Sequence, residues 1–235
     1  MTFSAIQIKT GQDFGQNLAR LKSYIAKSGD IVVAPEVALT GFAYDRFEEA
    51  AQFGQRALEE LLPLSKERLI CYTQIEKRGK KFFNIAKVLY QERVLYEQPK
   101  VKLFKFGGET EYFTPGDMEQ VRLFEAMGLK IGLLICFELR FIDIWQKLRG
   151  ADVILLPAMW GKLRKRHFEQ LSDALALMHQ CFLIAANSAN EDMAKSSALI
   201  DPFGQAYRDD RRALLNKEAD LTKIKKMRRY MDVGL

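Results

Sequence analysis

Three residues with chemically useful side chains each stand where an apolar stretch of the sequence ends. Glu36 follows IVVAP, Lys100 follows a stretch that carries Val94 and Leu95, and Cys136 follows IGLLI. At the carboxyl end of a buried strand the backbone is rigid while the side chain meets a crevice, so such ends collect ligand and catalytic groups. Each residue alone has an ordinary structural explanation, but together a carboxylate, an ammonium and a thiol indicate one shared site.

This combination of groups fits acyl transfer through a thiol. A thiol with its usual pKa of about 8.5 is only slightly ionised at neutral pH and needs a base or a nearby cation. Glu36 is the candidate base for Cys136, and Lys100 is the candidate cation that favours the thiolate and later an oxyanion. A histidine base is the obvious competitor, but His167 falls in a basic cluster and His179 lies beside an apolar helix position. The residues therefore favour a cysteine activated by glutamate.

Strand and helix patterns alternate around these positions. The periodicity predicts strands over 3–9, 30–36, 151–158 and 181–188, hairpins over 69–90 and 121–136, and helices over 14–25, 46–62 and 141–150. A further helix carries the apolar stripe Phe168, Leu171, Leu175 and Met178. No linker rich in Pro, Gly or Ser divides the chain. We therefore expect a single α/β domain over residues 1–235, with a short basic C-terminal segment.

Composition and charge narrow the class of protein. Apolar residues make up 48% of the 235-residue chain, which is enough for a sizeable core. The net charge is +6, because 36 basic residues face 30 acidic ones. Part of the excess lies in KIKKMRR (223–229), which is typical of a solvated helix face. We therefore expect no nucleic-acid partner.

The cysteines and the N-terminal segment bear on the compartment. Cys71, Cys136 and Cys181 stand in unrelated contexts without a CxxC pair, which argues against disulfides and a zinc site. The N-terminal segment has no signal-peptide pattern, and no apolar stretch is long enough to span a bilayer. We expect a soluble, cytoplasmic protein without a membrane partner or a bound metal.

Several stretches resemble the nitrilase superfamily of carbon–nitrogen hydrolases. APEVALTGFAYD, around Glu36, is similar to the glutamate box of that family, and IGLLICFELRF, around Cys136, is similar to its nucleophile box. YEQPKVKLFKFGGETEYFTPGD resembles the lysine box, with Lys100 as the lysine and Glu109 as a second glutamate. RGADVILLPAMW and SSALIDPFG resemble two further family stretches, and all of these occur in the family's order.

The resemblance implies a fold and a reaction. The fold is a four-layer α-β-β-α sandwich, and the reaction is hydrolysis of a non-peptide C–N bond in a small amide, through a cysteine thioester, with release of ammonia. Cys136 matches the nucleophile and Glu36 the base, while Lys100 and the backbone N–H of Phe137 would hold the oxyanion. Glu109 would position the substrate or assist the base. No cofactor is required, and the family implies a homodimer or a higher homo-oligomer.

Other activities stay open within this amidase- and carbamoylase-like branch. An N-carbamoyl amine or amino-acid hydrolase of the β-ureidopropionase type would use the same four residues and release carbon dioxide as well. A nitrile carbon could also be attacked by the same thiol. A non-catalytic binding or scaffold protein with the same fold is the alternative from a different class.

Four residues are candidates for the substrate pocket, namely Phe42, Tyr44, Arg140 and Trp160. Arg140 could bind a substrate carboxylate bidentately, but we favour a role in which it braces the turn through Glu138.

Some positions depart from the family pattern. Glu138 stands where an aspartate is common, and Leu175 and Met178 replace an Arg–Glu pair, which leaves the subfamily open. The C-terminal tail is short for the family, so we expect that part of a dimer contact to differ from that of relatives.

Overall fold

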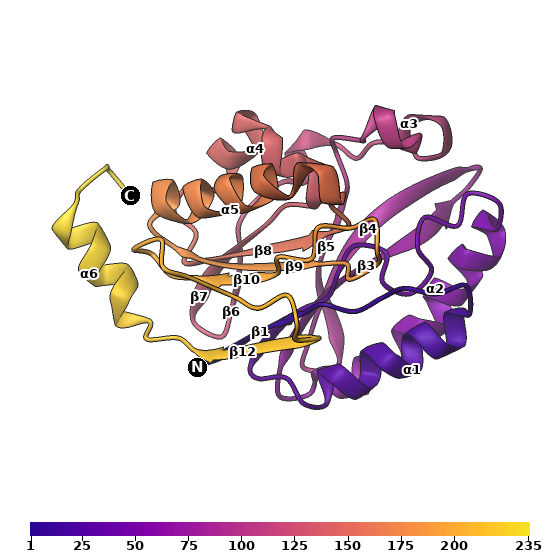
Figure 1. Cartoon of the computed structure of the whole chain (residues 1–235), viewed down its shortest axis with the longest axis horizontal. Coiled ribbons are helices and arrows are strands. Elements are labelled where there is room, and N and C mark those ends of the chain that lie inside the picture. The colour runs from indigo at the N-terminus through magenta and orange to yellow at the C-terminus, as the bar shows by residue number, and fades with distance from the viewer.

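The strands form two mixed sheets that face each other (Figure 1) in a computed structural model that describes residues 1–235. One sheet has the order β12 (Leu214–Glu218), β1 (Thr2–Ile6), β2 (Ile31–Val33), β3 (Leu69–Arg78), β4 (Lys81–Tyr90) and β5 (Arg93–Pro99). The other has the order β11 (Ala206–Arg208), β10 (Ala198–Ile200), β9 (Phe182–Asn187), β8 (Val153–Ala158), β7 (Leu129–Leu133) and β6 (Phe124–Ala126). In each sheet three neighbouring strands are parallel, and the pairs that flank them are antiparallel.

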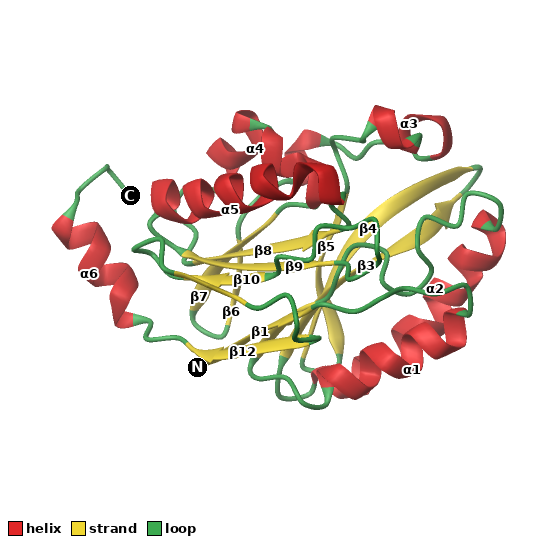
Figure 2. Cartoon of the chain, viewed as in Figure 1, coloured by secondary structure: helices red, strands yellow, loops and turns green.

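Helices cover the outer face of each sheet (Figure 2). α1 (Phe14–Ile25) and α2 (Phe47–Leu61) pack on the first sheet, and α4 (Ile142–Lys147) and α5 (Lys165–His179) pack on the second. The short α3 (Glu109–Tyr112) follows β5, and α6 (Thr222–Tyr230) follows β12. This arrangement is the four-layer α-β-β-α sandwich in one domain, so the expected fold is confirmed. No helix of the chain is both long enough and apolar enough to cross a membrane.

Alternation of side chains along β2 explains how the layers are held together. Ile31 and Val33 belong to the apolar cluster between the two sheets, whereas Val32 belongs to the cluster beneath α1 and α2. Successive side chains of a strand point to opposite faces, so a strand buried on both faces reads as a continuous apolar run. The run IVVAP before Glu36 therefore marks a strand at the centre of the sandwich.

The predicted hairpins are confirmed, and the second is closed by a tight two-residue turn. β6 and β7 pair around Met127 and Gly128, whose φ angles are +55° and +74°. Positive φ at both central residues is the geometry of a type I′ turn, which matches the twist of the strands that it joins.

Two predicted element ends and one predicted apolar-stripe position were wrong. β2 ends at Val33 rather than at residue 36, because the chain turns there toward the second sheet, where the Glu36 N–H donates to the Ala158 carbonyl at 3.1 Å. α4 ends at Lys147, since the residues up to Gly150 form tighter turns with bonds three residues apart. Met178, which was predicted to belong to the apolar stripe of α5, is instead 65% exposed.

The buried row of α5 explains the error at Met178. This row consists of Phe168, Ser172, Leu175 and His179. Its spacing of four, three and four residues follows the helical period more closely than the stripe read from the sequence.

Candidate active site

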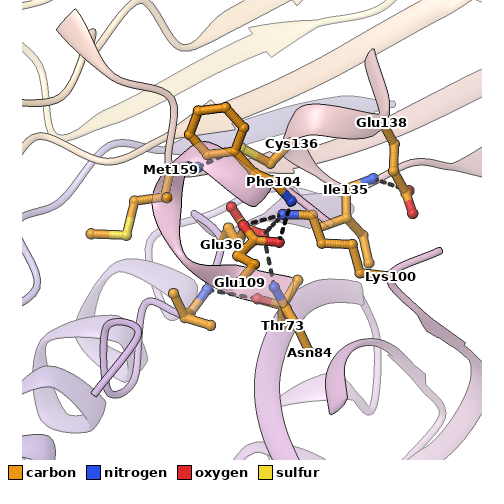
Figure 3. A network of polar contacts seen from close by, with 12 residues as sticks. Glu36, Thr73, Asn84, Lys100, Phe104, Glu109, Ile135, Cys136, Glu138 and Met159 are labelled. Carbon is orange, nitrogen blue, oxygen red and sulfur yellow. Dashed lines mark hydrogen bonds and ion pairs between the residues drawn. The ribbon is translucent and has the colours of Figure 1, made fainter. Parts of the chain in front are cut away.

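Glu36, Lys100 and Glu109 form one buried cluster (Figure 3). Lys100 Nζ donates to Glu36 Oε1 at 2.8 Å and to Glu109 Oε1 at 2.7 Å. All three side chains are buried, so the single ammonium serves two carboxylates in a place with little access to water. The other oxygen of Glu109 accepts the backbone N–H of Phe104 at 3.0 Å. The structure therefore brings together three of the four residues that the sequence assigned to the chemistry.

Asn84 on β4 positions Glu36 and Lys100. Its side-chain Nδ2 donates to Glu36 Oε1 at 2.8 Å, and its backbone carbonyl accepts the backbone N–H of Lys100 at 2.8 Å. Sequence reasoning missed this residue. The available signal was a polar side chain inside the apolar strand FFNIAKVLY, because a buried amide needs partners.

Cys136 occupies a sharp turn that begins three residues after the end of β7. Its φ of +48° lies in the left-handed region, which costs a non-glycine residue about 1–2 kcal/mol. The backbone N–H of Met159, which follows β8, donates to its Sγ at 3.4 Å. Figure 3 shows Cys136 beside the Glu36–Lys100–Glu109 cluster, so the fourth residue joins the same site.

The electrostatics of the site keep the thiol protonated. Burial raises the pKa of Cys136 well above its ordinary value; Glu36 raises it further, and Lys100 opposes both without reversing them. Burial lowers the pKa of Lys100, but Glu36 and Glu109 outweigh it and leave that pKa raised. The Oε2 atom of Glu36 is buried and has no hydrogen-bond partner. The cluster thus offers a free proton acceptor, rather than a preformed thiolate.

Glu138 braces the turn, but its partners differ from our expectation. Its carboxylate accepts the N–H of Ile135 and the N–H of Val101, both at 2.6 Å. These contacts join the residue before Cys136 to the residue after Lys100. Burial raises the pKa of Glu138 to about 7, against the opposing effect of these backbone donors.

Arg140 does not contact Glu138, so the bracing role predicted for this arginine was wrong. Arg140 Nη2 instead donates to His167 Nδ1 at 2.8 Å, and its guanidinium lies 4.9 Å from the centre of the Trp160 ring. The Glu138 carboxylate is already hydrogen-bonded by backbone N–H groups, so it needs no ion pair with Arg140.

The four predicted pocket residues fall into two cavities. Arg140 and Trp160 line a cavity of about 30 Å³ that contains Cys136, together with Phe104, Phe137, Met159, Gly161 and Arg164. Phe42 and Tyr44 line a neighbouring cavity of about 470 Å³. Tyr44 is partly immobilised there, because its hydroxyl donates to the Gly107 carbonyl at 2.8 Å and its ring stacks on Tyr112.

The backbone of Phe137 follows Cys136 in the same turn, and the Phe137 ring packs against Phe104 and Phe141. No three His, Cys, Asp or Glu side chains gather closely enough to hold a metal ion.

The geometry and the sequence agree with a known family. The family described as carbon-nitrogen hydrolase matches residues 2–209. The match covers most of the chain, so the chain belongs to the carbon–nitrogen hydrolase family, and the resemblance to the nitrilase superfamily is confirmed.

Individual relatives cover nearly the whole chain. A 2-oxoglutaramate amidase of Bacillus subtilis (strain 168) is 25% identical, with 93% of this chain and 90% of that protein covered. An omega-amidase of Mus musculus is also 25% identical, with 97% and 91% covered. The crystal structure of a CN-hydrolase superfamily protein from Xanthomonas campestris, which carries an arsenic adduct in its active site, is 20% identical with a TM-score of 0.86 over 98% of this chain and 94% of that one.

Proposed function

We propose that this protein hydrolyses the C–N bond of a small amide through a thioester on Cys136 and releases ammonia. One observation carries the proposal: the buried Oε2 of Glu36 has no partner, and the charge of Glu36 acts on a protonated thiol. An oxygen of this kind can accept the proton of a nucleophile. The amidase names of two relatives support the reaction type.

In the first half of the reaction, Glu36 takes the proton of Cys136 as the sulfur attacks the carbonyl carbon. An S–C bond forms, and the carbonyl oxygen becomes an oxyanion. Lys100 Nζ and the backbone N–H of Phe137 hold this charge, and loss of one such donor costs about 3 kcal/mol of barrier. Glu36 then protonates the nitrogen, the C–N bond breaks, and ammonia leaves.

In the second half, Glu36 takes a proton from water, whose oxygen attacks the thioester carbon. The C–S bond breaks, the acid leaves, and the thiol recovers its proton from Glu36. Glu109 supports both halves through its contact with Lys100 at 2.7 Å. One carboxylate that serves by turns as base and acid completes this cycle without a cofactor or a metal.

The substrate that we propose carries an anionic end, as the ω-amide of a dicarboxylic acid does. Arg140 and Arg164 both line the cavity of Cys136, and burial together with the charge of Arg164 lowers the pKa of Arg140. A carboxylate between the two guanidinium groups would relieve this repulsion and accept paired hydrogen bonds. Arg164→Gln should therefore raise KM about tenfold for an anionic amide. An uncharged amide of equal length should show no such change.

A panel of amides, N-carbamoyl compounds and nitriles, assayed for ammonia, tests the reaction. Ammonia from an amide, with an acyl mass on Cys136, supports the proposal. Carbon dioxide released with the ammonia would select the N-carbamoyl reaction, and ammonia from nitriles alone would select nitrile hydrolysis. No release and no adduct would leave a binding or scaffold protein.

Replacement of Cys136 by alanine should reduce turnover about 10⁴-fold or more, because no other group can form the thioester. The free energy of unfolding should change by less than about 1 kcal/mol, since the thiol makes a single weak contact with the Met159 N–H. Denaturant unfolding and ammonia release measure the two effects. Ammonia release at the wild-type rate by Cys136→Ala would overturn the mechanism.

We also propose that the chain pairs with a second copy through α4 and α5. Ile142 and Met178 are exposed there, and with Trp145 and Val233 they line an apolar hollow of about 340 Å³. Exposed apolar surface of this kind marks protein contacts. Light scattering should show a dimer, and Met178→Glu should shift the mass toward that of a single chain.

The reducing cytoplasm stays our prediction for the compartment. The three cysteines are all free and buried. A thiol nucleophile of the proposed kind works only in its reduced form.

A further inference from the structure

Met159 separates the two cavities of the candidate active site. The cavity beside Cys136 measures about 30 Å³, and the cavity on the other side of Met159 measures about 470 Å³. Met159 is the one residue that lines both. Figure 3 shows that its side chain runs away from Cys136, while its backbone nitrogen bonds to the sulfur.

The backbone around Met159 is held from several sides, so its side chain is the part that can move. The Ala158 carbonyl accepts the N–H of Glu36 at 3.1 Å, and the N–H of Trp160 donates to Asn187 Oδ1 at 2.7 Å. A methionine side chain is unbranched and changes rotamer easily. It can therefore shift without displacing the atoms that surround the thiol.

The cavity beside Cys136 is too small for an amide substrate while Met159 stays in place. A volume of about 30 Å³ holds about two water molecules, fewer atoms than a short ω-amide contains. The larger cavity has room, and its lining includes polar side chains of Thr10, Tyr112 and Asn190. A substrate thus needs space that a shift of Met159 would supply.

Building on the proposed function, we propose that the larger cavity receives the nitrogen side of the amide and that Met159 sets how large a nitrogen substituent is accepted. Glu36 would protonate the leaving nitrogen, and residues 40–45, which follow it closely in the chain, wall the larger cavity. Arg140 and Arg164, which would hold the acid end, line the smaller one. The inferred further substrates are secondary amides of the same acids, which release an amine in place of ammonia by the same bond changes.

The test compares one dicarboxylic acid amidated with ammonia, methylamine or butylamine. The released dicarboxylic acid is measured, since it is the product common to all three. Met159→Ala should raise kcat/KM for the N-butyl amide, relative to the primary amide, by about tenfold or more, the effect expected when a pocket gains a few methylenes of space. Most of the change should appear as a lower KM for the N-butyl amide.

Met231→Ala is the matched control, because Met231 lies after α6 and is half exposed. This variant should leave the ratio of the two kcat/KM values at its wild-type value. An unchanged ratio in Met159→Ala would overturn the role of Met159.

Alkylation of Cys136 by chloroacetamides with growing nitrogen substituents separates this inference from the proposed function. Cys71 and Cys181 are fully buried, so a single added mass reports Cys136. Faster reaction of the N-butyl reagent with Met159→Ala than with the wild type supports the role of Met159, even in a protein that hydrolyses no amide. Equal alkylation rates in an enzyme that does hydrolyse amides would refute that role and leave the proposed function intact.

Discussion

Two clusters in this chain each bring one lysine to two glutamates at nearly the same distances. In the candidate site, Lys100 Nζ lies 2.8 and 2.7 Å from its two carboxylates. On β4, Lys87 Nζ lies 2.7 Å from Glu76 and 2.8 Å from Glu97. Arg78 also reaches both of these glutamates, at 2.8 and 2.6 Å. In the Lys87 cluster two cations therefore balance two anions, and every carboxylate oxygen has a partner.

The Lys100 cluster lacks a second cation. One ammonium serves two carboxylates, Oε2 of Glu36 has no partner, and burial raises the pKa of Glu109. Burial also acts to raise the pKa values of the two glutamates near Lys87, but hydrogen bonds to their cations outweigh it and leave both lowered. Similar lysine–carboxylate distances thus accompany opposite shifts in pKa, since the pKa of Glu109 is raised and those of Glu76 and Glu97 are lowered. A free carboxylate oxygen beside a thiol, rather than the ion pair itself, is what distinguishes the candidate site.

The largest difference should follow removal of each lysine. Lys100→Met leaves two buried carboxylates without a cation, so the free energy of unfolding should fall by about 3–5 kcal/mol. Turnover should fall about 10³-fold, because an oxyanion donor is lost. Denaturant unfolding and ammonia release measure these effects.

Lys87→Met is the matched control for that experiment. It should cost less, about 2 kcal/mol, because Arg78 still pairs with both glutamates and Glu97 is partly exposed. Its activity should stay at the wild-type level. A loss of activity equal to that of Lys100→Met would show that the two clusters are not distinct in function.

Replacement of one glutamate in each cluster should give a smaller difference. Glu109→Gln removes one of the two charges that hold Lys100, so kcat should fall about 10²-fold. Glu97→Gln should leave kcat unchanged, since Glu97 lies outside the site. Steady-state kinetics of the two purified variants decide the matter, and equal kcat values would remove Glu109 from the mechanism.

The smallest effects should appear in the pH dependence of stability, with opposite signs in the two regions. Burial raises the pKa of Glu138 from 4.5 to about 7, so the unfolded chain gives up this proton at lower pH than the folded one. The ionised group therefore costs stability, and the free energy of unfolding should fall as the pH rises through this window. Glu138→Gln should flatten the fall by about 1–2 kcal/mol between about pH 5 and about pH 7.

Glu97→Gln provides the comparison of opposite sign. Its lowered pKa stabilises the fold at neutral pH, and that stabilisation is lost as the pH falls through the folded pKa. The variant should therefore lose less stability than the wild type on acidification. Urea unfolding at a series of pH values measures both slopes, and slopes of the same sign would contradict the contrast.

The parts of the fold and the site that depend on local patterns were predictable. Alternating and continuous apolar runs indicated the strands and the covered sheets. Strand ends indicated Glu36, Lys100 and Cys136, because each catalytic candidate directly follows or lies close behind a strand. Boundaries were less accurate where the chain leaves a ladder, as it does after Val33.

The remaining contacts of the site arise where loops from different strands meet, and no local pattern encodes them. Glu138 accepts a backbone N–H from Ile135 in its own turn and a second one from Val101, which follows a strand of the other sheet. Asn84 reaches Glu36 across 48 positions of sequence. Met159 separates two cavities because residues of the β2–α2 connection wall the larger one. Arg140 bonds to His167 rather than to Glu138, which is nearer in the sequence. The spacing of residues along the chain does not predict such contacts between distant loops.

The bond between the Glu36 N–H and the Ala158 carbonyl has a consequence for the order of folding. It joins the ends of two sheets whose strands come from distant parts of the chain, and pairings of such long range form slowly. During refolding, helical and hairpin signals should recover first, and hydrolytic activity should recover only when the two sheets have closed on each other. Activity in this protein is therefore a reporter of the last stage of assembly.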